Sequence, residues 1–130
     1  MSTIAEQIVA VAQEWLGTPY LIGGNQKGVG VDSTQLAIQV LVEVGFLPVA
    51  DYSDATPSLV VADLVERGAT QLKSSWPTGG EIIVYRDPDG TKHLAICEKT
   101  LSVIYASRIK GMVVADNHPD GFPAKKWVIP

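Results

Sequence analysis

The sequence predicts an α+β domain in which helices from the N-terminal half pack on a C-terminal antiparallel β-sheet of about five strands. Apolar residues recur with helical spacing in the first half of the chain, whereas short β-rich runs separated by turn signals fill the second half. Helices followed by strands, rather than alternating with them, are typical of an antiparallel sheet. A chain of 130 residues can bury enough surface for one core, so we expect a single domain over residues 1–130.

The first and third helices have recognisable starting residues. Thr3 followed by Glu6 has the form of a capping box, and the apolar pattern that follows ends at Gly17. Thr56 offers a cap for a later, shorter helix, and Pro57 suits its first turn because that position needs no backbone N–H. We therefore expect one helix near the N-terminus and another after residue 56.

The second helix is expected to begin at Asp32. An aspartate is a good N-cap, Gln35 stands in the reciprocal position of a capping box, and an apolar stripe continues to Gly45. The glycine-rich residues 18–31 before it have no periodicity, so they are interpreted as a loop that turns tightly or closely approaches another group.

Strands are expected in the second half, where the apolar period changes. Turn signals, of which residues 87–90 (Asp-Pro-Asp-Gly) are the clearest, separate short β-rich runs. These runs cover residues 82–85, 93–98, 102–106, 112–114 and 127–129.

Composition excludes several classes of function. Apolar residues make up 46% of the chain and charged residues 18%, as in globular proteins, and a net charge of -4 gives no support for nucleic-acid binding. We expect no signal peptide and no membrane insertion, hence synthesis in the cytoplasm.

No cofactor is expected, since the glycine-rich loop lacks the features of a phosphate-binding loop. No metal site is expected either, because the turn aspartates lack ligand spacing: Asp87, Asp89, Asp116 and Asp120.

Ser33 occupies a reactive position at the start of the second helix. A helix N-terminus stabilises an anion and would favour the thiolate of a cysteine placed there, but it cannot make serine a resting alkoxide. A serine would need a base, and the chain has two histidines. His93 opens a strand-like run, whereas His118 lies in a turn-like segment, so we assign the base to His93.

Cys97, the only cysteine, is not expected to act as the nucleophile in place of Ser33. It follows His93 by four residues on one strand, which separates the two side chains by about 13 Å at strand rise. That distance is beyond proton-transfer reach. We expect Cys97 to be a small buried side chain.

Several segments resemble the NlpC/P60 family of papain-like cell-wall cysteine peptidases. They are Leu16-Gly17-Thr18-Pro19-Tyr20, Gly23-Gly24, and residues 27–32, where the family's aspartate is followed directly by the catalytic cysteine. His93-Leu94-Ala95-Ile96 and residues 102–107 are similar to the family's histidine strand and the strand after it.

The resemblance implies a papain-like NlpC/P60 fold and assigns roles to individual residues. Ser33 stands at the nucleophile position, His93 is the general base, and Tyr105 is the possible orienting residue, where the family has His, Asn or Gln. Tyr20, Asp32 and Gly24 are assigned to substrate binding, although capping alone accounts for Asp32. The activity implied is hydrolysis of peptide bonds in peptidoglycan stems, often next to D-glutamate and diaminopimelate.

Within the family, residues 27–32 and 127–130 look most like the small peptidases encoded with phage tails and gene-transfer agents. This implies phage-tail proteins as possible partners and delivery to the cell envelope on a particle. The alternative, from another class of function, is a catalytically silent peptide-binding or tail structural module that uses the same cleft.

Three explanations fit the serine at position 33, and we take them in this order. The residue is a Cys→Ser change introduced to trap an inactive enzyme; it is a natural loss that leaves a peptide-binding protein; or it is a serine nucleophile in its own right. Exchanging sulfur for oxygen preserves the shape of the site and removes the thiolate.

Overall fold

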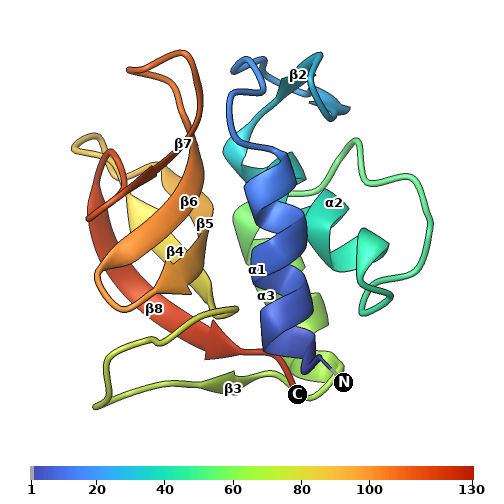
Figure 1. The fold of residues 1–130 in the computed structure, drawn as a ribbon, viewed down its shortest axis with the longest axis vertical. Helices are drawn as coiled ribbons and strands as arrows, with labels where there is room; N and C mark the ends of the chain where they lie inside the picture. Colours follow the sequence, from blue (N-terminus) through green and yellow to red (C-terminus); the bar gives the residue numbers. More distant parts are fainter. Residues whose placement is uncertain (1) are drawn as a thin grey trace.

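The computed structural model describes residues 2–130 and has two layers, with the helices on one side and a curved sheet on the other (Figure 1). Capping groups fix the helix starts. The helices are α1 (Ile4–Glu14), α2 (Ser33–Glu43) and α3 (Pro57–Glu66). The strands are β1 (Asn25–Gln26), β2 (Gly30–Val31), β3 (Thr70–Gln71), β4 (Ile82–Arg86), β5 (Lys92–Lys99), β6 (Ser102–Ser107), β7 (Met112–Asp116) and β8 (Phe122–Val128).

The main sheet has the order β3-β8-β4-β5-β6-β7, and its neighbouring strands pair antiparallel. The α+β prediction is confirmed, but the expected number of about five strands is wrong, since this sheet has six. The strand that was missed, β3, has only two residues and is too short to show a period. A further two-stranded sheet, β1-β2, lies within the segment that was interpreted as a loop.

The helix starts follow the predicted caps, with one exception. Thr3 and Glu6 form the expected capping box, and Thr56 caps α3 with Pro57 in its first turn. Asp32 caps α2, but the reciprocal half of a capping box is absent from it. Gln35 instead donates its side-chain amide to the Tyr52 carbonyl at 2.9 Å, because the chain returns past this side of the helix.

The sheet buries apolar side chains on both faces, which explains the continuous apolar run in β5. Leu94 and Ile96 face the helices and belong to the main core, in which both are fully buried. Ala95 and Cys97 point the other way into a second, smaller cluster. A central strand covered on both sides is rigid, so β5 is a firm support for the side chain of His93 at its start.

Across residues 2–130, no helix combines the length and the apolar character needed to cross a bilayer.

Candidate active site

The start of α2 is fixed by both oxygens of the Asp32 carboxylate. Oδ1 accepts the Gln35 backbone N–H at 2.8 Å, as an N-cap does, and Oδ2 accepts the Gly23 backbone N–H at 2.8 Å. The aspartate therefore ties the glycine-rich loop to the helix. Ser33, the first residue of the helix, is held at this junction with only 3% of its surface exposed.

Ser33 and His93, sixty residues apart in the sequence, are in contact. The Ser33 Oγ atom lies 3.1 Å from His93 Nδ1. The two side chains that the sequence pairs thus lie in contact, and their catalytic roles stay predictions. A neutral imidazole with its proton on Nε2 would accept the serine O–H at Nδ1, as a general base must.

Asp87 supplies the group that orients this imidazole. Its Oδ2 atom lies 2.9 Å from His93 Nε2, and its Oδ1 atom accepts the Thr91 backbone N–H at 3.1 Å. The carboxylate thus favours the tautomer with the proton on Nε2. Tyr85 adds a stacked ring beside the imidazole, with 5.2 Å between centroids. These contacts join the Ser33 hydroxyl, the His93 imidazole and the Asp87 carboxylate in one continuous chain, which we call the relay.

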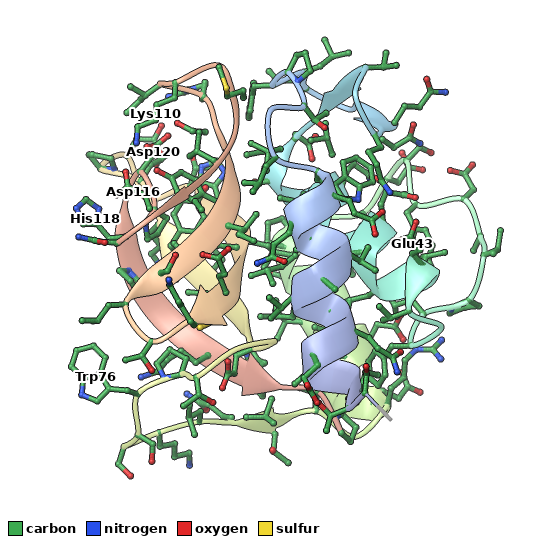
Figure 2. All side chains as sticks on the ribbon, viewed as in Figure 1. Glu43, Trp76, Lys110, Asp116, His118 and Asp120 are labelled. Atoms are coloured by element: carbon green, nitrogen blue, oxygen red, sulfur yellow. The ribbon has the colours of Figure 1, made fainter. Side chains whose placement is uncertain are left out.

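Tyr105 does not have the orienting contact predicted for it. Its hydroxyl donates to Asp120 Oδ1 at 3.2 Å. Asp120 lies on the sheet side of the molecule (Figure 2) and lines the same small cavity as His93. Burial and the nearby Asp120 charge raise the pKa of the Tyr105 phenol. Tyr105 instead packs edge-on against Tyr85 at 6.1 Å, so it supports the ring that stacks on His93.

The contact between Asp87 and His93 was not predicted because Asp87 stands in a turn. Asp87 follows β4, and the hairpin register that pairs Tyr85 with His93 folds the turn back toward the imidazole. The signal was an aspartate six residues before the histidine in the same hairpin. It becomes useful only when the register is known, because a shift of one residue would send either side chain to the opposite face.

The substrate-binding predictions have different structural settings. Tyr20 lines a small cavity of about 70 Å³ together with His93 and Arg108. Burial, followed by the charge of Asp32, raises the Tyr20 pKa. Gly24 approaches the chain itself, since a Cβ there would lie 2.6 Å from the Gly30 carbonyl carbon. Packing accounts for Gly24 and capping for Asp32; their substrate contacts, like that of Tyr20, stay predictions.

Cys97 lies in the second core cluster with 1% of its surface exposed. Burial, with the neighbouring Glu81 charge, raises the pKa of its thiol to about 12. A thiol in this state is not a nucleophile near neutral pH, as expected from the sequence. In the same described range, residues 2–130, no three His, Cys, Asp or Glu side chains are grouped to hold a metal ion.

Comparison with known proteins gives a structural match only. No family model and no curated protein sequence matches the chain. The crystal structure of the NlpC/p60 domain of peptidoglycan hydrolase SagA superposes with a TM-score of 0.69 at 24% sequence identity. The match covers 98% of this chain and 99% of that one.

The chain has the NlpC/p60 fold. This agrees with the fold expected from the resemblance of residues 16–32 and 93–107, and the extent of the match includes both segments. In this NlpC/p60 fold, the start of α2 carries Ser33 and the start of β5 carries His93, the two side chains in contact. The arrangement is suited to acyl transfer, in which a nucleophile attacks a carbonyl and a neighbouring imidazole removes its proton.

Proposed function

We propose that this chain is a peptidase scaffold of the NlpC/P60 type that acts on peptidoglycan stem peptides, with Ser33 at the nucleophile position and His93 as the general base. The observation that carries the proposal is the 3.1 Å contact between Ser33 Oγ and His93 Nδ1, with Asp87 on the other ring nitrogen. The fold shared with a domain of a peptidoglycan hydrolase supports the substrate class.

The relay suits hydrolysis of an amide in two stages. As the atom at position 33 attacks the carbonyl carbon, His93 Nδ1 takes its proton, and Asp87 stabilises the imidazolium formed. His93 then returns the proton to the leaving amine, and water repeats the sequence to release the acyl group. Backbone N–H groups in the first turn of α2 favour negative charge on the carbonyl oxygen.

The serine hydroxyl is a much weaker nucleophile in this setting than a thiol. The helix N-terminus contributes about 1 kcal/mol, which is far too little to ionise a hydroxyl, whereas a thiol starts within a few pH units of ionisation. The chain as it stands is therefore expected to bind its peptide and to cut it slowly or not at all.

Exchanging Ser33 for cysteine tests the proposal directly. Ser33→Cys should cleave soluble peptidoglycan fragments at least about 100-fold faster than the parent chain, because it restores a thiolate to the same position. Product release is followed by chromatography and mass spectrometry. Ser74→Cys, which adds a thiol at an exposed position, is the matched control and should behave as the parent does.

The other results of this assay identify the alternatives. If neither protein cuts but both bind the fragments, the chain is a catalytically silent peptide-binding or tail module. That alternative is favoured by the hydroxyl at position 33, which keeps the hydrogen bond to His93 without a thiolate. If the parent cuts as fast as Ser33→Cys, Ser33 is a nucleophile in its own right, and the Ser-His-Asp relay is its catalytic device.

We further propose that the chain belongs to the phage-tail or gene-transfer-agent type and is carried to the cell envelope on a particle after synthesis in the cytoplasm. The likeness of residues 27–32 and 127–130 to those proteins supports this. Mass spectrometry of purified particles from the source strain should detect the chain in a fixed ratio to tail proteins. Its recovery only from the particle-free fraction would contradict this assignment.

A further inference from the structure

Three cationic side chains stand on the face of the sheet that is covered by α3. Arg86 on β4 pairs directly with Lys92 on β5, so their side chains share a face. Lys125 on β8 pairs with Val84, which precedes Arg86 by two residues and has the same orientation. The three charges therefore come from three neighbouring strands and form one group, which we call the basic cleft.

The basic cleft is a real cavity between α3 and the sheet. Its volume is about 290 Å³, and its walls include the three cations, Trp127 and the first turn of α3 with Ser58. The Lys92 Nζ atom lies 3.4 Å from Ser58 Oγ, so it already faces the helix start. An α-helix start carries partial positive charge, which adds to the charge of the side chains.

These cations have no counter-charge from the protein. Within residues 2–130, no carboxylate lies within ion-pair distance of Arg86, Lys92 or Lys125, and the same holds for four cations outside the cleft: Lys73, Lys99, Arg108 and Lys126. Arg86 donates from Nη1 to the Gly90 carbonyl at 3.4 Å. No Asp or Glu lines the cavity. Like charges directly opposite each other on paired strands repel, and this chain is acidic overall at -4. A bound anion would reduce the repulsion among these three exposed cations.

The start of α3 adds one uncharged donor to the cleft. The Ser58 backbone N–H is left free by the Thr56 cap, which accepts from Leu59, and has no acceptor in the described part of the chain. A ligand rich in oxygen acceptors matches walls with spare donors.

The cleft is adjacent to the Ser33–His93–Asp87 relay. Arg86 directly precedes Asp87, and Lys92 directly precedes His93, so their Cα atoms are each about 3.8 Å from those of relay residues. The side chains then point to opposite faces of the strands. A peptide that crosses the end of the β4–β5 hairpin can therefore contact the relay with one residue and the cleft with another.

We propose that the basic cleft binds a carboxylate of the peptide whose amide reaches Ser33. The identity of that peptide as a peptidoglycan stem rests on the function proposed above. Arg86 offers the planar donor pair that suits a carboxylate, while Lys92 and Lys125 act as point charges at its sides. Selection of acidic peptides over neutral ones is the consequence.

Binding to the parent protein tests the cleft without requiring turnover. A ¹⁵N-labelled sample is titrated with a stem-type tetrapeptide that has free carboxylates, and separately with the same peptide fully amidated. The free acid should shift the amide signals of Ser58, Lys92 and Lys125, and its Kd should be at least about tenfold lower than that of the amidated form. Added salt should weaken the binding of the free acid more.

Variants assign this effect to the cleft. Arg86→Gln combined with Lys92→Gln and Lys125→Gln should abolish the preference for the free acid while the binding of the amidated peptide stays unchanged. Lys73→Gln, which removes an exposed positive charge outside the cleft, is the control and should retain the preference. Thermal unfolding of all variants checks that they are folded.

Each contrary result is distinct. Shifts at Ser33 and His93 without shifts at the cleft, or equal Kd values for the two peptides, would overturn the inference and leave the proposed function standing. Inorganic phosphate that shifts the cleft signals while the peptide does not would make this a site for a free anion and also overturn it. If no peptide binds at all, the inference fails, and the Ser33→Cys assay decides the function separately.

Discussion

Removing the imidazole of His93 from the Ser33→Cys protein is expected to lower kcat/KM by about 10²- to 10⁴-fold. His93 Nδ1 lies 3.1 Å from the nucleophile position, and its ring is held by Asp87 and stacked on Tyr85. Without it, no described side chain is placed to remove the proton or to stabilise a thiolate at position 33. His93→Ala is measured by the initial rate of peptidoglycan fragment cleavage.

The second histidine provides the control for this experiment. His118 is exposed, contacts the Pro119 carbonyl, and lies on the sheet side of the molecule, away from the helices (Figure 2). His118→Ala in the same Ser33→Cys background should keep the full rate. A protein that loses activity with His118→Ala and retains it with His93→Ala would refute the assignment of the base.

Exchanging Asp87 for asparagine is expected to give the next largest loss, about 10²-fold or more. The carboxylate accepts the proton of His93 Nε2, whereas the amide of an asparagine can donate to that nitrogen. The ring proton would then move to Nδ1, the atom that has to accept the proton of the nucleophile. Asp87→Asn should therefore lower kcat/KM at least as much as Asp87→Ala does, although asparagine is closer in shape to aspartate than alanine is.

Asp89 separates this electrostatic effect from damage to the turn. Both aspartates accept the Thr91 backbone N–H, at 3.1 Å from Asp87 and 2.8 Å from Asp89, but only Asp87 contacts His93. Asp89→Asn should loosen the turn and leave kcat/KM nearly unchanged. Equal losses from Asp87→Asn and Asp89→Asn would mean that the turn, and not the carboxylate on the imidazole, is what matters.

The helices could be predicted because their signals are local. A cap and an apolar stripe lie within a few residues of each other, as at Thr3 and Glu6 or at Thr56 and Pro57, and the structure confirms both starts. Gln35 is the exception, since its partner is the Tyr52 carbonyl, seventeen residues away. A distant acceptor of this kind leaves no mark on the residues near the cap.

The sheet and the third relay residue depend on pairing, which is not local. The strand β8 begins five residues before the predicted run at 127, through a segment with Pro123 and two lysines that lacks the usual strand composition. This segment becomes part of β8 because it pairs with β4. In the same way, Asp87 reaches His93 only through the register of the β4–β5 hairpin, whereas motif spacing pointed to Tyr105.

The central claim is that the start of α2 and His93 form a nucleophile–base pair, and the pKa of the Ser33→Cys thiol tests it most directly. Thiolate absorbance is followed against pH, with the parent chain as the blank. Cys97, whose thiol has a pKa of about 12, contributes no change at lower pH.

We expect the new thiol to titrate at about 3.5–7.5, below the ordinary value near 8.5, because both the helix start and the imidazolium stabilise the thiolate. His93→Ala should raise that pKa toward the ordinary value. A thiol pKa of about 8.5 or above that is the same with and without His93 would contradict the pairing of these two positions.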